Sequence, residues 1–139
     1  MIRKAKLADK VEITRLYHKL YPERKRYLKE LLPIEKFNAK SLFFVSEEKK
    51  SIVGFIWSTF INYGNSRVGY VEDLFVKKEY RNKGIGTSLV RRVIRELKKL
   101  KVAVIYVPTE KGRKEAIKIY RNLGFRKDSN QCWFYLKTW

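Results

Sequence analysis

The 139 residues of this chain suffice for one ordinary domain and are too few for two, so we expect residues 1–139 to form a single domain. The apolar fraction of 45% can fill a core, but no apolar stretch is long enough to cross a membrane, and one cysteine excludes an internal disulfide. The formal charge of +19 favours anionic partners and argues against a polycationic substrate.

The N-terminal half predicts a strand, two helices and three more strands. Apolar and basic residues alternate over residues 2–7, as in a half-buried strand. Asp9 followed by Glu12 predicts a capping box at the start of a helix with an apolar face of Val11, Ile13, Leu16, Tyr17 and Leu20. A second helix is expected from Pro22 to about Leu32, before Pro33. Apolar runs between turn signals predict strands over Ser41–Ser46, Ser51–Ile61 and Val68–Val76.

The C-terminal half predicts two helices and two strands. A short turn leads into an amphipathic helix over Thr87–Leu100. The apolar run Val102–Val107 is typical of a strand buried on both faces, parallel to the strand before the turn. A helix over Arg113–Leu123 and a last strand over Cys132–Leu136 complete the chain. The sequence therefore predicts a single mixed α/β domain.

The turn between the third of these strands and the next helix has the features of an anion-binding site. It consists of Arg81, Asn82, Lys83, Gly84, Ile85 and Gly86. Its glycines allow a tight turn, and the free N–H groups at a helix N-terminus attract negative charge. From Lys77 to Lys101 ten basic residues face two acidic ones, a net +8. We expect a phosphate or pyrophosphate here, although a solvated helix face would account for much of this charge.

At these residues the chain resembles the GNAT superfamily of N-acetyltransferases. The resemblance rests on the Arg-x-x-Gly-x-Gly turn at Arg81–Gly86, which follows the strand Glu72–Val76, and on Ala116, Tyr120, Gly124 and Phe125 downstream. The strand Tyr70–Val76 is most similar to that of the diamine and polyamine acetyltransferase branch. The order of elements extends the resemblance over nearly the whole chain. The alternative reading of the glycines is an ordinary tight turn.

This resemblance implies a fold, a co-substrate and its contacts. The fold is a GNAT-like domain with a mostly antiparallel mixed sheet, a splayed parallel pair and helices on both faces. Acetyl-CoA is the implied donor, with its pyrophosphate on the backbone of Asn82 to Thr87 and its pantetheine arm along Leu74, Phe75 and Val76. Many members of the family carry an Asn near the start of the last helix that contacts the coenzyme. In this chain that position falls at about Arg113, which together with Lys111 and Lys114 would instead contact the coenzyme phosphates.

Tyr120 is the candidate general acid, because it matches the tyrosine that the family uses four residues before Gly124. A phenol with a pKa of about 10 can protonate a thiolate of similar basicity. The alternative is a core tyrosine that only packs against the sheet, and the two roles are compatible.

Glu72 is the candidate general base, directly or through water, because it lies nine residues before Arg81, where the polyamine acetyltransferases that this strand resembles carry their proposed base. Strand alternation puts Glu72, Leu74 and Val76 on one face and Val71, Asp73 and Phe75 on the other, so only one carboxylate is expected in a given cleft. The alternative is an ion pair between Glu72 and a nearby Lys or Arg. Asp73 is the reserve candidate and is expected to be a structural hydrogen-bond acceptor.

Two functions remain open from the sequence. The first is an acetyl-CoA-dependent N-acetyltransferase in which the primary amine of a small molecule or a protein attacks the thioester directly. The second is a non-catalytic, basic nucleic-acid-binding module on the same fold. Expected partners are acetyl-CoA, the amine acceptor, a second copy in a homodimer, and an acidic or nucleic-acid-associated protein. We expect no metal and no membrane contact, and a cytoplasmic location, since no signal peptide is evident.

Overall fold

The computed structural model describes residues 1–23, 41–109, 112–130, 134 and 136–137 of the chain. Its strands are β1 (Ile2–Lys4), β2 (Ser41–Glu48), β3 (Ser51–Asn62), β4 (Arg67–Val76) and β5 (Val104–Tyr106). Its helices are α1 (Lys10–Leu20), α2 (Ile85–Lys99) and α3 (Lys114–Asn122), with short 3₁₀ turns η1 (Leu7–Asp9) and η4 (Lys78–Tyr80).

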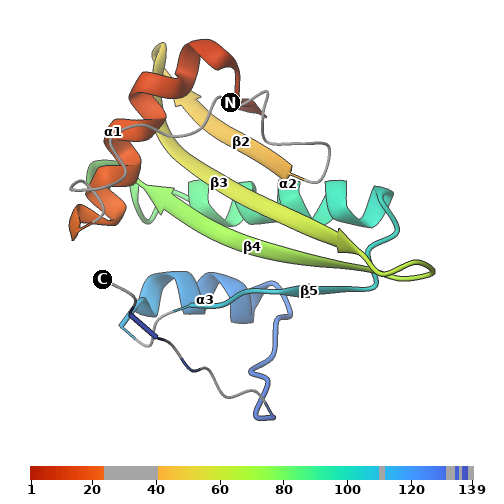
Figure 1. Ribbon diagram of the computed structural model, residues 1–139. Coiled ribbons are helices and arrows are strands. Elements are labelled where there is room, and N and C mark those ends of the chain that lie inside the picture. Colours follow the sequence, from red (N-terminus) through yellow and green to blue (C-terminus); the bar gives the residue numbers. More distant parts are fainter. Residues whose placement is uncertain (24–40, 110–111, 131–133, 135, 138–139) are drawn as a thin grey trace.

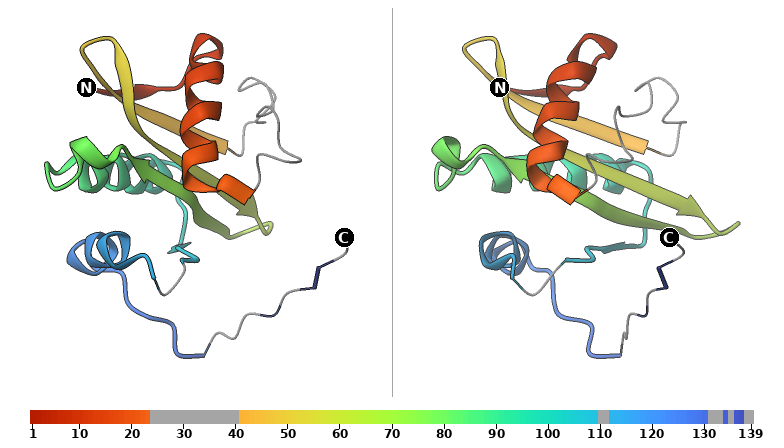
Figure 2. Two further views of the ribbon diagram at one scale, coloured as in Figure 1. Left: turned by 90° about the vertical axis from the view of Figure 1, so that its left-hand side faces the viewer. Right: turned by 60° about the vertical axis from the view of Figure 1, so that its left-hand side comes forward.

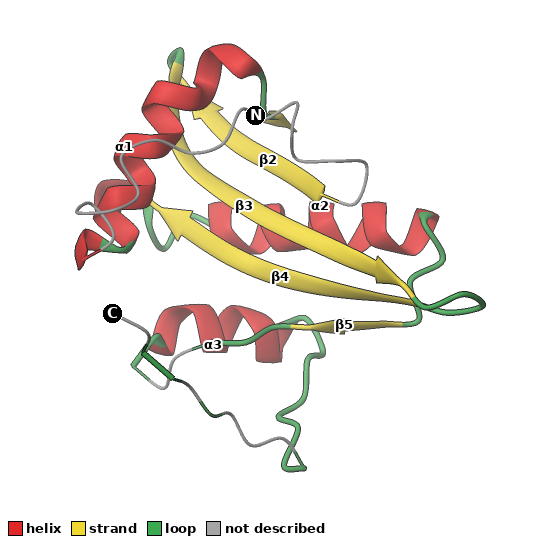
Figure 3. Ribbon diagram, in the orientation of Figure 1, coloured by secondary structure: helices red, strands yellow, loops and turns green. Residues whose placement is uncertain are grey.

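The five strands form one sheet in chain order, β1-β2-β3-β4-β5 (Figures 1 and 3). The first four strands pair antiparallel, and β4 and β5 pair parallel across the α2 connection. This mixed sheet in a single α/β domain confirms the predicted fold class.

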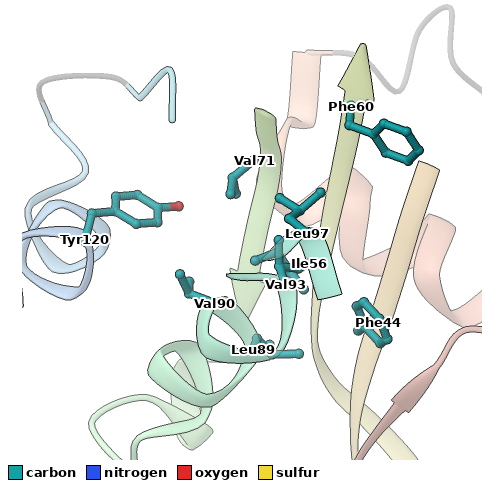
Figure 4. Close-up of a cluster of buried hydrophobic side chains, with 9 residues drawn as sticks. All are labelled: Phe44, Ile56, Phe60, Val71, Leu89, Val90, Val93, Leu97 and Tyr120. Carbon is teal, nitrogen blue, oxygen red and sulfur yellow. The ribbon is translucent and has the colours of Figure 1, made fainter. Parts of the chain in front are cut away.

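The helices cover both faces of the sheet, as Figure 2 shows for α1 and α2. On one face α1 packs on the sheet around a buried cluster of Ile13, Leu16, Tyr17, Phe43, Val45, Ile52, Phe55 and Phe75. On the other face α2 and α3 enclose a second cluster of Phe44, Ile56, Phe60, Val71, Leu89, Val90, Val93, Leu97 and Tyr120 (Figure 4). Helix α2, the predicted amphipathic helix, begins at Ile85, two residues earlier than expected.

The start of α1 differs from the predicted capping box. Asp9 is the N-cap residue but makes no side-chain cap; its carboxylate instead binds the guanidinium of Arg3 at 2.8 and 2.9 Å. Glu12 accepts a hydrogen bond from the backbone N–H of Ile52 in β3, at 2.9 Å. Val11, expected on the apolar face, is exposed. The two carboxylates therefore connect α1 to the sheet instead of capping the helix.

A β-bulge at Glu72 overturns the predicted alternation of β4. Asp73 lies opposite Trp57 and Val71 lies opposite Ser58, so Glu72 is an extra residue in β4. Val71 consequently packs in the α2 cluster, while Phe75 packs in the α1 cluster. The expectation that Val71 and Phe75 share a face was wrong because a bulge interrupts the two-residue period.

The prediction that Val102–Val107 is buried on both faces was also wrong, because only Val102, Ile105 and Val107 pack against the core. Only Val104–Tyr106 forms a strand, and Val104 and Tyr106 are 41% and 36% exposed. Among the described strands, β4 is the only neighbour of β5, so its outer edge has no described strand beside it.

Two predicted elements fall largely outside the described residues. The expected second helix lies mostly within 24–40, and the expected last strand includes the undescribed residues 131–133 and 135. Phe134 and Leu136, the described residues of that stretch, are not in a strand and are 90% and 85% exposed. Within the described ranges, no helix combines the length and hydropathy that crossing a bilayer requires.

Candidate functional site

The turn before α2 presents unpaired backbone donors. Gly84, the N-cap residue, has φ 79° and ψ 3°, a left-handed conformation that favours glycine, and no side chain caps the helix. The first helical bond runs from the N–H of Ser88 to the carbonyl of Gly84 at 3.0 Å. The N–H groups of Ile85, Gly86 and Thr87 thus have no partner within the helix, which makes this end a site for an anion.

The cationic side chains of the turn are held by local contacts. Arg81 donates from Nε to the backbone carbonyl of Val76 at 2.9 Å, which ties the turn to the end of β4. Lys83 lies over the ring of Tyr80, with Nζ 5.3 Å from the ring centroid. Asn82 has φ 60° and completes the reversal of the chain. The predicted turn therefore forms, and Arg81 takes part in its structure.

Strand β4 has an open edge beside this turn. It pairs with β5 only at Val68–Tyr70, opposite Val104–Tyr106. Beyond Tyr70 no described strand pairs with β4 on that side, so the backbone edge of Leu74, Phe75 and Val76 has no strand neighbour there among the described residues. This divergence is the splay that the resemblance implies.

A cavity of about 470 Å³ lies where β4 and β5 have diverged. Its lining is Tyr17, Leu20, Tyr21, Trp57, Glu72, Asp73, Leu74, Pro108, Thr109, Arg113, Ala116 and Tyr120. Residues from α1, β3, β4 and α3 thus meet at one place, and both sequence-predicted catalytic candidates, Glu72 and Tyr120, line it.

Both adjacent carboxylates line this cavity because of the bulge. Glu72 accepts a hydrogen bond from Thr59 Oγ1 at 2.7 Å, and among the described residues no Lys or Arg forms an ion pair with it. Asp73 is buried and accepts a hydrogen bond from the hydroxyl of Tyr21. The expectation that only one of the two faces a given cleft was therefore wrong, while Asp73 has the structural acceptor role expected of it.

Tyr120 is 7% exposed and lies in the α2 cluster. Figure 4 shows its ring reaching from α3 towards Val71 of β4, with the hydroxyl oxygen leading. The ring meets Phe125 edge-on, at 5.7 Å between centroids and 67° between planes. Burial raises the pKa of Tyr120 to about 12, with Arg113 lowering it and Asp73 raising it. The phenol is therefore fully protonated at neutral pH.

Arg113 lies on the cavity side of the site. It is the N-cap residue of α3, and its guanidinium carbon lies 5.4 Å from the ring centroid of Tyr21. The described lining of the cavity includes Arg113 and no residue of the 81–87 turn. A contact between Arg113 and coenzyme phosphates stays a prediction.

Sequence reasoning missed Tyr21 and Thr59. Tyr21 was considered only as the end of a helix before Pro22, and its partner Asp73 is 52 positions away in sequence. Thr59 meets Glu72 because β3 and β4 pair there. No local pattern signals either contact. Within the described part of the chain, no group of three His, Cys, Asp or Glu side chains lies close enough to hold a metal ion.

Comparison with known proteins agrees with this geometry. A protein from Sulfurisphaera tokodaii named N-alpha-acetyltransferase is 29% identical over 136 residues, covering 91% of this chain and 80% of that protein. N-alpha-acetyltransferase 30 of Xenopus laevis is 40% identical over 70 residues, 50% of this chain. That match covers 26% of the Xenopus protein, so the chain spans only part of this relative. The diamine and polyamine branch is not confirmed.

A solved structure shows the same fold. The ribosomal-protein-alanine N-acetyltransferase of Brucella melitensis biovar Abortus 2308 aligns with a TM-score of 0.79 at 17% identity, covering 98% of this chain and 99% of that one. The sequence model of the Acetyltransferase (GNAT) family matches residues 10–125, which include α1, the turn, the cavity and Tyr120. The chain therefore belongs to the acetyltransferase (GNAT) family.

Proposed function

We propose that this chain is an acetyl-CoA-dependent N-acetyltransferase whose acceptor is the N-terminal amine of a protein. The observation that carries this proposal is the cavity in which Glu72 on the β4 bulge and Tyr120 on α3 meet beside the open edge of β4. Family membership supplies the reaction class, and the cavity supplies groups suited to it.

The described residues fit acetyl-CoA. The helix N-terminus at Gly84–Thr87 offers uncapped N–H groups, which suit a pyrophosphate. Leu74, Phe75 and Val76 lie along the open edge of β4, where an extended amide-containing arm adds as a strand does. Arg81 and Lys83 add positive charge at the turn. When bound, acetyl-CoA supplies an activated acetyl thioester.

Acetyl transfer needs a proton acceptor and a proton donor from the protein. In the reaction the C–N bond forms as the C–S bond breaks, the amine loses its proton, and the sulfur gains one. Glu72, held by Thr59, takes the amine proton directly or through water. Tyr120, which lines the same cavity from α3, donates a hydrogen bond or a proton to the departing sulfur. No protein nucleophile is required.

The choice of a protein N-terminus rests on two observations. The relatives just described are named N-alpha-acetyltransferases, at up to 40% identity. The cavity also combines a carboxylate, which suits an amine, with the apolar surfaces of Leu20, Trp57 and Leu74, which suit a first side chain. We therefore expect peptides with an apolar first residue to be preferred over those with an acidic or a basic one.

The test is a thermal-shift measurement with acetyl-CoA followed by a thiol-release screen. The screen covers peptides with a free N-terminus, peptides with a blocked N-terminus and one lysine, polyamines, amino acids and aminoglycosides. We expect stabilisation by acetyl-CoA and release of CoA with the first group. Stabilisation without release by any amine would reject catalysis, and release by polyamines alone would reject the protein acceptor.

The basic surface of α2 favours an acidic partner that carries the acceptor. Arg91, Arg95, Lys98 and Lys99 project from α2, which lies on the face of the sheet opposite α1. A partner bound there leaves the cavity beside α1 open. The comparisons give no support to the non-catalytic nucleic-acid-binding alternative. A homodimer and a cytoplasmic location remain predictions, the first to be tested by light scattering.

A further inference from the structure

The part of the chain that carries Tyr120 is joined to β4 by few backbone contacts. Strand pairing between β4 and β5 ends at Tyr70 and Tyr106, well before the bulge at Glu72. Figure 1 shows α3 lying beyond the diverging edge of β4. On the α2 side, Ile119 packs so closely on Gly86 that a Cβ there would lie 2.8 Å from Ile119 Cδ1. At the cavity end, no strand pairing among the described residues connects β4 to the segment that carries α3, and side chains of both line the cavity.

Tyr21 makes a polar connection at the cavity end, beside the apolar packing of Tyr120 on Val71. It is the C-cap residue of α1, and its backbone N–H bonds to the carbonyl of Tyr17 at 2.9 Å. Its ring packs on that of Tyr17, with centroids 5.2 Å apart, and its hydroxyl donates to Asp73 of β4. The guanidinium of Arg113 covers the same ring at 5.4 Å. One side chain thus contacts α1, β4 and the start of α3.

The place of Arg113 relative to Tyr120 gives this connection a consequence for the site. The two residues are seven positions apart, which is two helical turns or about 10.5 Å along α3. Residues at this spacing lie on the same side of a helix, and both line the cavity. A contact that fixes Arg113 against β4 therefore also fixes the orientation in which Tyr120 enters the cavity.

We propose that Tyr21 is a positioning residue that braces α3 against β4 and so sets the placement of the Tyr120 hydroxyl relative to the reacting sulfur. It acts through Asp73 on one side and Arg113 on the other. This role rests on the proposed acetyl transfer, but the brace itself is a property of the fold. Arg113 and Asp73 also shift the pKa of Tyr120 in opposite directions, so all four side chains are electrostatically connected.

Three variants test the brace. Tyr21→Phe removes the hydroxyl and keeps the ring under Arg113, while Tyr21→Leu removes both contacts. Tyr106→Phe is the matched control, because it deletes the same hydroxyl from a tyrosine that stacks on Tyr70 outside the cavity. We expect Tyr21→Phe to lower kcat by about 3- to 10-fold, the factor equivalent to one net hydrogen bond, with the KM for acetyl-CoA unchanged. Tyr106→Phe should retain wild-type kcat.

A double variant shows whether Tyr21 acts through Tyr120. If it does, adding Tyr21→Phe to Tyr120→Phe lowers kcat by less than about 2-fold, since the group being positioned is already absent. If Tyr21 acts independently of Tyr120, the fold-losses in kcat of the two single variants multiply in the double variant instead. Multiplied losses, or a wild-type kcat in Tyr21→Phe, overturn the proposal.

Hydrogen exchange tests the brace without any acceptor. In Tyr21→Leu the amides of α3, Lys114–Asn122, should exchange faster, while those of α2, Ile85–Lys99, keep their wild-type protection. Equal protection of α3 in wild type and Tyr21→Leu, or equal loss in both helices, overturns the brace. If no amine accepts acetyl groups, the proposed function fails while the exchange result still decides the brace.

Discussion

Replacing Tyr120 with Phe isolates the role of its hydroxyl. The ring remains in the cluster with Val71 and Val90 and keeps its edge contact with Phe125. None of the described residues hydrogen-bonds to the Tyr120 hydroxyl, so its removal leaves no described group unpaired. We therefore expect the free energy of unfolding to change by less than about 1 kcal/mol.

The expected loss of activity follows from the pKa of Tyr120. A thiol has an ordinary pKa of about 8.5, whereas burial holds the phenol of Tyr120 at about 12. Complete proton transfer to the thiolate is then uphill by about 3.5 pKa units, or about 5 kcal/mol. A hydrogen bond from the neutral phenol to the developing thiolate avoids this cost and contributes about 1.5–3 kcal/mol. Tyr120→Phe should thus lower kcat by about 10- to 150-fold, less than the largest general-acid effects.

Steady-state kinetics with saturating acetyl-CoA measure this loss, and thermal unfolding of the same variant checks the fold. The KM for acetyl-CoA should stay within about 2-fold, because the hydroxyl interacts with the sulfur only as the C–S bond breaks. Full activity in Tyr120→Phe would refute the donor role. A loss accompanied by a strongly lowered Tm would show that the tyrosine is needed for packing.

Three further predictions concern the base, the turn and alkaline pH. Glu72→Gln should lower kcat by about 100-fold because the proton acceptor is lost, whereas Thr59→Val, which removes only the hydrogen bond that holds the carboxylate, should lower it less; a wild-type kcat in Glu72→Gln would reject the base. Gly84→Ala should lower the free energy of unfolding by about 1–2 kcal/mol and weaken acetyl-CoA binding, because φ is 79° at this residue. Gly112→Ala is the control, since Gly112 also lies in open space but has no positive φ, and it should have neither effect. Equal effects of the two variants in thermal unfolding and calorimetric titration would reject a role of the turn in binding acetyl-CoA. Burial raises the folded pKa of Tyr120 from 10.0 to about 12, so it penalises only the ionised phenol. The wild-type protein therefore keeps its stability below pH 10 and loses about 2–3 kcal/mol as the pH rises through 12. Denaturant titrations of Tyr120→Phe should show a smaller alkaline loss, and an identical loss in both proteins would contradict this.

The sequence predicted the elements whose signals are local. The Arg81–Gly86 turn and the helix after it carry glycines followed by a 3.6-residue apolar period, and both form within two residues of the predicted bounds. The parallel pairing of β4 and β5 followed from the helical connection between them. Tyr120 and Glu72 were placed by family resemblance, and the structure brings both to one cavity.

The remaining features depend on partners distant in sequence. The bulge at Glu72 arises where β3 and β4 come into register, and it turns both carboxylates into the cavity. Asp9 and Glu12 have the spacing of a capping box, yet Arg3 and the backbone of Ile52 compete for them. Tyr21 and Asp73 meet across 52 positions. A local sequence pattern does not show which distant group a side chain will bind, because tertiary packing decides this.

The position of the acetyl group on a peptide acceptor shows most directly whether this chain acetylates protein N-termini. The peptide has a free N-terminus, an apolar first residue and one internal lysine, and it is incubated with the protein and acetyl-CoA before fragmentation mass spectrometry. We expect one acetyl group on the N-terminal amine, with the product lost or strongly reduced in Glu72→Gln and Tyr120→Phe. Acetylation confined to the lysine, or no acetylation by a protein that acetyl-CoA stabilises, would contradict it.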